Sequence, residues 1–140
     1  MSRQKSQGTA FEAARKNQWK AAGVYAGRLA EGGLGDLGDL WIAHHPEGPG
    51  GDIGWVEECK AMANLNQHKT LAKAIEKAGH ERVILSHKRL VDKGGKRRVP
   101  DGVPTINVTS PHAMRVLLRA YLTLSEIRPD LLRELWGEDE

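Results

Sequence analysis

The sequence predicts an α/β domain in which a mixed β-sheet is flanked by helices. Three observations predict it: helical spacing of apolar residues near the N-terminus, short β-branched and aromatic runs divided by glycine, and further helical patterns in the second half. At 140 residues, 39% of them hydrophobic, the chain is long enough to bury one core. We therefore expect a single domain over residues 1–140, with flexible ends at 1–8 and 137–140.

The first helix is predicted over residues 9–22. Thr9 followed by Glu12 has the spacing of a capping box, apolar residues then recur at helical intervals, and Gly23 is a typical helix end. A strand is predicted next, over residues 24–29.

A glycine-rich turn over residues 31–35 separates this strand from a second one, predicted over 37–42. A loop rich in proline and glycine leads to a third strand over 53–59. If that loop is a simple hairpin connection, the second and third strands are antiparallel.

The remaining elements alternate between helical and extended patterns. A helix is predicted over residues 65–78, and a compact apolar run over 82–86 is typical of a buried strand. Residues 91–104 are predicted to be a loop or a hairpin that turns at Gly94-Gly95.

A short strand over residues 105–108 precedes a helix that begins at Ser110-Pro111, an N-cap serine followed by proline at the first helical position. A last short helix is predicted over 129–136. The expected order is therefore α-β-β-β-α-β-β-α, with the short helix after it.

Positive charge is concentrated in two segments. Residues 82–98 hold seven Lys or Arg against one acid, and residues 1–20 hold five against Glu12 alone. This asymmetry indicates a basic surface for a polyanion such as DNA, branched or duplex, although a solvated basic loop is the alternative. The candidate DNA-binding residues are Arg3, Lys5, Arg15, Lys16, Lys88, Arg89, Lys96, Arg97 and Arg98.

Composition also argues against several classes of protein. No apolar run approaches the length that spans a bilayer, and the N-terminus does not lead into an apolar signal segment. The single cysteine, Cys59, excludes an intramolecular disulfide and a cysteine-based zinc site. We expect a cytoplasmic protein, in the host cytoplasm if it is encoded by a phage, without a membrane partner.

The most informative pattern is an acid, a gap of 18 residues, and Glu58-Cys59-Lys60 in a strand: Asp39…Glu58-x-Lys60. Side chains alternate along a strand, so Glu58 and Lys60 share one face and Glu57 lies on the other. Two carboxylates beside a lysine can bind a hard divalent cation and activate water. The pattern predicts a nuclease.

Two other acids compete for these positions. Asp36 lies three residues before Asp39, but Asp39 adjoins the apolar run and is therefore expected to lie on the strand. Glu57 competes with Glu58, but alternation places Glu57 on the face opposite Lys60.

A leading helix with Glu12, a strand bearing Asp39, a strand with Glu58-Cys59-Lys60, and then a helix and a strand resemble the PD-(D/E)XK nuclease superfamily. Within it, the chain most resembles Holliday junction resolvases of archaeal type and their phage relatives. The resemblance spans roughly residues 5–88 and implies a restriction-endonuclease-like core. Gly38 stands where the proline of the motif's name is expected, and glycine also permits the turn into a strand.

The resemblance implies that Asp39 and Glu58 bind Mg²⁺ together with the main-chain carbonyl of Cys59, and we expect Mn²⁺ to substitute. It further implies that Lys60 positions or helps activate the attacking water and offsets charge that develops on the phosphorus.

Two further residues are implied at the site. Glu12 matches an acid that the superfamily often carries on its first helix and would reach the metal through water, but it could instead cap its helix. Gln67 matches a polar residue that points at the site, but it could simply be exposed.

The expected function is a Mg²⁺-dependent, structure-selective DNA endonuclease of the Holliday junction resolvase kind, acting in recombination and repair. Two coordinated cuts require a two-fold homodimer, for which the last helices are candidates. Two alternatives stay open: another nuclease of the superfamily, whether restriction-like, repair or flap-cutting, or a basic DNA-binding protein without catalysis.

Overall fold

The computed structural model describes residues 3–46, 53–93, 96–98 and 102–137. It is an α/β structure with a five-stranded mixed sheet flanked by helices, which confirms that part of the predicted fold. The chain divides into two compact units, Met1–Thr109 and Ser110–Glu140, and each is described here by itself. The single domain expected from the sequence stays a prediction.

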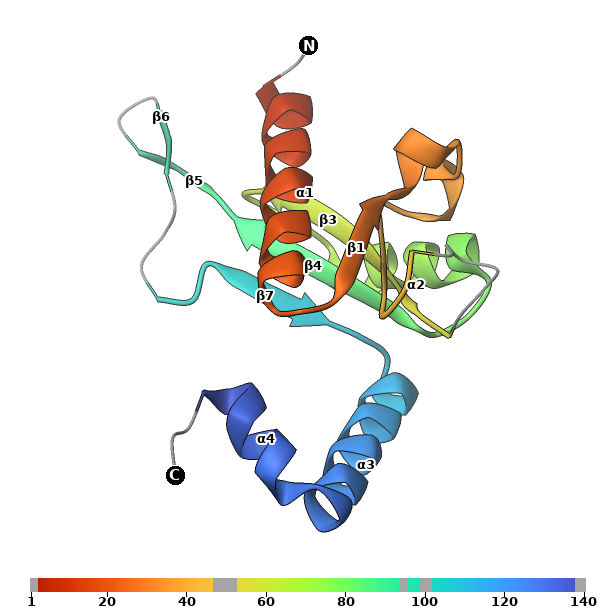
Figure 1. The fold of residues 1–140 in the computed structure, drawn as a ribbon. Coiled ribbons are helices and arrows are strands. Elements are labelled where there is room, and N and C mark those ends of the chain that lie inside the picture. Colours follow the sequence, from red (N-terminus) through yellow and green to blue (C-terminus); the bar gives the residue numbers. More distant parts are fainter. Residues whose placement is uncertain (1–2, 47–52, 94–95, 99–101, 138–140) are drawn as a thin grey trace. The chain divides into compact units, whose positions relative to one another are not determined.

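The first unit contains the sheet and two helices (Figure 1). Its elements are α1 (Arg3–Ala21), β1 (Tyr25–Arg28), the short 3₁₀ helices η1 (Leu29–Gly32) and η2 (Gly35–Leu37), β2 (Leu40–Ala43), β3 (Trp55–Met62), α2 (Gln67–Ala78), β4 (Val83–Arg89), β5 (Val91–Lys93), β6 (Lys96–Arg98) and β7 (Thr105–Val108). The second unit contains α3 (Pro111–Ile127) and α4 (Pro129–Trp136).

The sheet has the strand order β1-β2-β3-β4-β7. Strands β1, β2 and β3 pair antiparallel, as the hairpin pattern predicts, whereas β3 and β4 are parallel and are joined through α2. Strand β7 pairs antiparallel with the outer side of β4. The register places Glu58 beside Leu85 and Lys60 beside His87.

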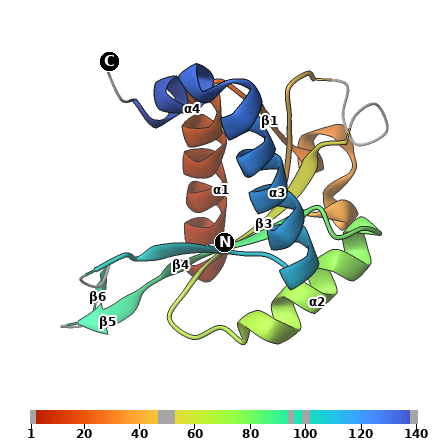
Figure 2. The ribbon, with the colours of Figure 1, turned by 90° about the horizontal axis from the view of Figure 1, so that it is seen from below.

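Strands β5 and β6 pair as a separate two-stranded antiparallel ribbon, which confirms the hairpin alternative for this segment. The turn predicted at Gly94-Gly95 lies outside the described residues. Figures 1 and 2 both show this ribbon projecting away from the five-stranded sheet.

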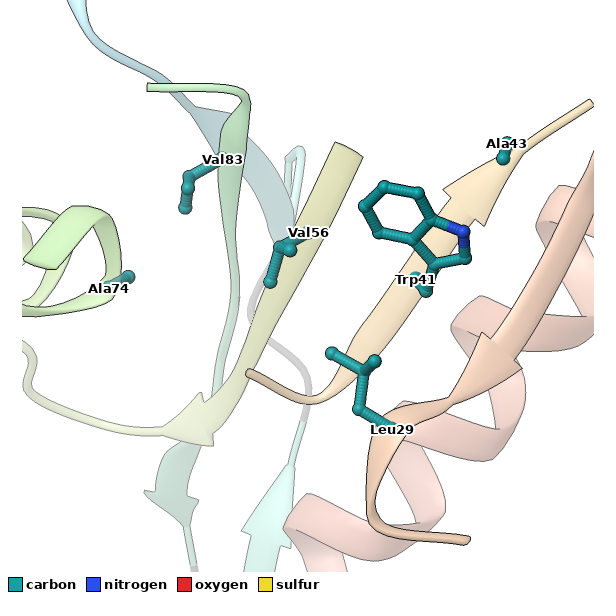
Figure 3. Packing of buried hydrophobic residues seen from close by; sticks show 6 residues of the cluster. All are labelled: Leu29, Trp41, Ala43, Val56, Ala74 and Val83. Carbon is teal, nitrogen blue, oxygen red and sulfur yellow. The ribbon is translucent and has the colours of Figure 1, made fainter. Parts of the chain in front are cut away.

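The two faces of the sheet are covered by different helices (Figure 1). Helix α2 packs on one face, where Trp41, Val56 and Val83 lie in a buried cluster with Ala74 of the helix (Figure 3). Helix α1 packs on the other face, where Phe11 of the helix contributes to a second buried cluster. The remaining buried members of that second cluster are Leu40, Cys59, Ala61 and Leu90.

Helix α1 begins at Arg3 rather than at Thr9, so the predicted start and its capping box are wrong. Thr9 and Glu12 are interior helical residues. The only residue in Arg3–Gly8 that disfavours a helix is Gly8, and one interior glycine costs only about 1 kcal/mol relative to alanine. The helix therefore continues through the segment that the capping signal appeared to exclude.

The second strand is shorter than predicted because β2 begins at Leu40. Gly38 has φ +150°, a conformation that other residues rarely adopt, and it ends η2. Asp39 therefore precedes the strand. Its backbone is nevertheless fixed on both sides, since its N–H donates to Glu57 O at 3.1 Å and its carbonyl accepts from Leu29 N at 3.0 Å.

Two of the described helices begin at a side-chain cap, and the cap of α3 is the one that was predicted. Asn66 caps α2 by accepting a hydrogen bond from Lys69 N at 3.1 Å, and Gly79 ends that helix with φ +81°. Ser110 caps α3 by accepting from Ala113 N at 3.1 Å, with Pro111 at the first position.

None of the helices in the described part of the chain combines the length and apolar character that a bilayer crossing requires.

We expect Gly38→Ala to destabilise the protein by about 2 kcal/mol or more, because the backbone is strained for alanine and the new Cβ would clash with Val56 Cγ1. Gly8→Ala is the matched control. A Cβ at Gly8 meets nothing within 4 Å, and alanine in a helix interior should stabilise by about 0.5–1 kcal/mol. Urea denaturation of both variants measures this difference, and an equal effect of the two substitutions would contradict the assigned turn.

Candidate active site

The candidate site lies where β2 separates from β3. The ladder between these strands ends at the pair Leu40 and Glu57, so β2 offers no backbone partner to Cys59 N. Asp39 takes that place with its side chain, and its Oδ2 accepts a hydrogen bond from Cys59 N at 2.7 Å. The carboxylate of Asp39 is thus held against the backbone of β3, between Glu58 and Lys60.

Glu58 and Lys60 lie on the α2 face of β3, as strand alternation predicts. Lys60 Nζ lies 3.6 Å from Glu58 Oε1. Glu58 is buried, with 5% of its surface exposed, whereas the Lys60 side chain is 35% exposed. The structure therefore brings together the three residues of the sequence motif, with the ammonium nearest to solvent.

A second lysine also binds Glu58. Lys77 Nζ of α2 lies 3.0 Å from each oxygen of the Glu58 carboxylate. The sequence analysis did not identify this residue. The available signal was the repetition of lysine at every fourth position of α2, namely Lys69, Lys73 and Lys77, which places all three on one side of the helix.

Glu12 belongs to the electrostatic environment of this site rather than to a helix cap. Its Oε1 lies 3.6 Å from Arg28 Nε, and its side chain is 16% exposed. Burial raises the pKa of Glu12, the Arg28 guanidinium opposes the shift, and the charge of Glu58 adds to it. The catalytic role of Glu12 stays a prediction.

The pKa of Asp39 is raised from its ordinary value of 3.8 to about 6. Burial is the largest cause of this raised pKa. The negative charges of Glu58 and, to a smaller extent, of Glu12 also contribute to it, while the Cys59 N–H and the Lys60 ammonium oppose it. The mutual repulsion means that Asp39 and Glu58 are close enough for each charge to affect the other.

The donor chemistry of these residues fits a hard divalent cation. Such ions bind carboxylate oxygens and keep several waters, so Asp39 and Glu58 would suffice as protein ligands, and a cation would relieve the repulsion between them. Within residues 3–46, 53–93, 96–98 and 102–137, no group of three or more His, Cys, Asp or Glu is arranged to hold a metal ion.

Gln67 is half-buried and is engaged by a histidine. Its Nε2 lies 3.1 Å from His87 Nδ1, and His87 Nε2 lies 3.0 Å from the carbonyl of Met62. Because a carbonyl only accepts, Nε2 carries the proton and Nδ1 accepts from Gln67. Gln67 thus supports the strand position next to Lys60, the ladder partner of His87.

Glu57, the rival of Glu58, is fully buried on the α1 face. Its Oε2 forms an ion pair with Arg15 at 2.8 Å and accepts from Ser86 Oγ at 2.5 Å, while Oε1 accepts from Trp19 Nε1 at 3.1 Å. Arg15, a candidate DNA contact, therefore uses its guanidinium to compensate a buried charge inside the protein.

The other candidate DNA contacts are distributed over α1, β4 and β6. Lys16 on α1 and Lys88 on β4 are half-buried, and Arg89 at the end of β4 is exposed. For Arg3 and Lys5 in α1, and for Lys96, Arg97 and Arg98 in β6, the structure describes the backbone and not the side chains. Their role in binding DNA stays a prediction.

A pocket of about 290 Å³ opens beside the site, between β3 and α2. Glu58 and Lys60 line it from the strand, and the three lysines of α2 line it from the helix. The carboxylate that would hold a cation is therefore next to a space that a substrate could enter.

Asp39→Asn should stabilise the protein at neutral pH in buffer free of divalent ions. Because the folded pKa of about 6 lies above the ordinary 3.8, the folded protein binds this proton more tightly than the unfolded chain does. Ionisation of Asp39 therefore lowers the free energy of unfolding as pH rises from 3.8 to about 6. The full loss of about 1–3 kcal/mol applies above pH 6. Asparagine keeps an oxygen for Cys59 N and removes the charge.

Urea denaturation at about pH 4 and at about pH 8 measures this effect. At the higher pH the variant should have a larger free energy of unfolding than the wild type, and at the lower pH the two values should be equal. Asp36→Asn, at an exposed position of η2, is the control and should change stability by less than about 0.5 kcal/mol at both. A gap of equal size at both pH values would contradict the assigned burial of Asp39.

Comparisons with protein-family models, with curated proteins and with solved structures found no match to this chain. The resemblance to PD-(D/E)XK nucleases therefore stays a prediction, and the site is defined by this chain's own residues: two carboxylates and a lysine at the end of the β2–β3 ladder, beside a pocket lined by lysines.

Proposed function

We propose that this protein is a Mg²⁺-dependent DNA endonuclease with a restriction-endonuclease-like core, of the kind that resolves Holliday junctions. The observation that supports it is the convergence of the motif residues: Asp39 is held to the backbone of β3 at 2.7 Å, and Lys60 lies 3.6 Å from Glu58. Residues that are 19 and more positions apart in sequence meet at one place, next to a pocket.

In the proposed reaction, Asp39 and Glu58 would hold the cation, with the carbonyl of Cys59 as the further ligand that the superfamily resemblance implies. When bound, Mg²⁺ supplies a Lewis acid at the phosphate and lowers the pKa of water. Lys60 donates a hydrogen bond to the attacking water and offsets negative charge on the phosphate oxygens. The water oxygen forms a bond to phosphorus and gives up one proton to solvent. The bond from phosphorus to the leaving sugar oxygen breaks, and that oxygen takes up a proton from solvent.

Basic side chains would hold the DNA by its phosphates. Arg89 lies at the end of β4, further basic residues lie on β6, and Lys16 lies on α1. Phosphate contacts fix the position of a duplex without reading its bases, which suits recognition by shape.

Cleavage of a labelled four-way junction tests the proposal. Wild-type protein should cut it in Mg²⁺ or Mn²⁺ and not in EDTA, and should cut flaps and plain duplex more slowly. Asp39→Asn and Lys60→Ala should each reduce the rate by about 100-fold or more while junction binding persists. Asp36→Asn, which removes the neighbouring exposed acid, is the matched control and should cut like the wild type.

Unchanged cleavage in both the Asp39 and the Lys60 variant would refute the assigned chemistry. Binding without cleavage by any variant, including the wild type, would favour a DNA-binding protein in which the acids are structural. A preference for flaps or duplex over junctions would keep the nuclease and change its substrate.

We also propose that the protein acts as a two-fold homodimer, because resolving a junction requires two coordinated cuts. Helix α3 offers a surface for it: Leu118 and Leu122, one turn apart, are each 55% exposed.

Light scattering should give twice the chain mass of 15.4 kDa, and Leu118→Glu should give a monomer, since a charge in an apolar contact is unfavourable. Ala120→Glu, at another exposed position of α3, should remain dimeric. A monomeric wild type at micromolar concentration would contradict the dimer.

A further inference from the structure

The pocket beside Glu58 has a strongly positive lining. Four lysines, Lys60, Lys69, Lys73 and Lys77, line it together with a single glutamate. Lys77 and Lys60 lie 3.0 and 3.6 Å from Glu58, and one of their two positive charges offsets its carboxylate. The lining keeps an excess of positive charge, most of which comes from the other two lysines of α2.

Lys69 and Lys73 are exposed and have no carboxylate of the described residues within ion-pair distance of their ammonium groups. Lys69, Lys73 and Lys77 are spaced four residues apart in α2. Side chains with this spacing lie along one side of a helix. At 1.5 Å per residue the row extends over about 12 Å, the length of about three phosphates along one DNA strand.

We infer that this lysine row, defined as Lys69, Lys73 and Lys77, binds consecutive phosphates of a nucleic-acid strand and leads that strand to Glu58 and Lys60. The sequence analysis placed DNA contacts on α1 and on the segment 87–98, and none on α2. The inference rests on the proposed function only for the identity of the polyanion as DNA.

The shape of the pocket is consistent with a strand backbone. The lysines and the apolar side chains of Met62 and Leu65 line it together. Lys69 and Lys73 are exposed, whereas the ammonium of Lys77 contacts Glu58. A polyanion could therefore follow the row along the helix and meet Lys60 at its inner side. The alternative is that the lysines only solubilise an exposed helix face, in which case their position along the pocket has no effect on binding.

The salt dependence of binding tests the row directly. The probe is a fluorescein-labelled four-way junction in EDTA, so that cleavage does not interfere, and the readout is the slope of log K against log of the KCl concentration. Each phosphate contact contributes about 0.9 to that slope for duplex DNA. Lys69→Gln and Lys73→Gln should each make it shallower by about 0.9, the double variant by about 1.8, with weaker binding at every salt concentration.

Lys20→Gln is the matched control, since it removes one charge from an exposed position of α1 and is not among the assigned contacts. It should leave the slope unchanged. Unaltered slopes in the Lys69 and Lys73 variants, or an equal change in the Lys20 variant, would overturn the inference. All these changes are at exposed positions, and unchanged thermal melting of the double variant checks that the fold is retained.

The same experiment separates this inference from the proposed nuclease. If the Lys69 and Lys73 variants show a shallower salt dependence while the wild type cuts no junction in Mg²⁺, the lysine row is supported and the proposed nuclease is refuted. If the wild type cuts, and the row variants bind with the wild-type slope, the nuclease stands and the row falls.

Discussion

The central strand β3 carries two adjacent buried glutamates, and the pleat of the strand sends them to opposite faces of the sheet. Both residues are buried, with 0% of the surface of Glu57 and 5% of that of Glu58 exposed. A buried carboxylate is costly unless cations and hydrogen-bond donors surround it. The structure around β3 is largely the arrangement that satisfies these two charges, and it does so in different ways on the two faces.

On the α1 face the arrangement is closed. Arg15, Trp19 and Ser86 all bind Glu57, and they connect α1 and β4 to the central strand. Removing one member of such a buried pair typically costs about 3–5 kcal/mol, so this face is tied to stability. On the α2 face the cations that contact Glu58 are two lysines whose side chains are 35% and 41% exposed, so neither is enclosed by the protein as the partners of Glu57 are. That asymmetry makes Glu58, and not Glu57, the carboxylate that is free to change partners.

The sequence predicted the local parts of this arrangement because they depend on neighbours along the chain. Alternation alone separates Glu57 from Glu58, and the Ser110-Pro111 signal places the start of α3 where the structure has it. The pairing of Arg15 with Glu57 spans 42 residues and depends on how α1 docks, which no spacing shows. Lys77 was missed for the same reason: its regular spacing is visible in the sequence, but the side of α2 that faces β3 is decided by packing of Ala74.

The turn before β2 shows a different limit. Apolar continuity predicts that the strand includes residues 37–39, whereas the positive φ of Gly38 interrupts it and leaves Asp39 outside. The consequence for the site is favourable, because the β2–β3 ladder ends before Cys59 and its N–H donates to the carboxylate of Asp39. Asp39 was thus preferred to Asp36 because of a predicted strand boundary that is wrong, although the structure does place Asp39 beside Glu58 and Lys60.

The charges of the site add a constraint on what can bind there. Three carboxylates, on Glu12, Asp39 and Glu58, are accompanied by three cations, on Arg28, Lys60 and Lys77. When all six groups are ionised, their charges cancel. The raised pKa of Asp39 means that its carboxyl group binds a proton more readily than an ordinary aspartate does.

A divalent cation alone would therefore leave an excess of positive charge in a partly buried place, and a phosphate alone would meet the carboxylates. Under the proposed function the two would be favourable together. Glu58 would take part in holding the cation, and the Lys77 ammonium, on the same side of α2 as Lys69 and Lys73, would then be available to the phosphate. Coupling of this kind would make the affinity for either one depend on the other by the same factor.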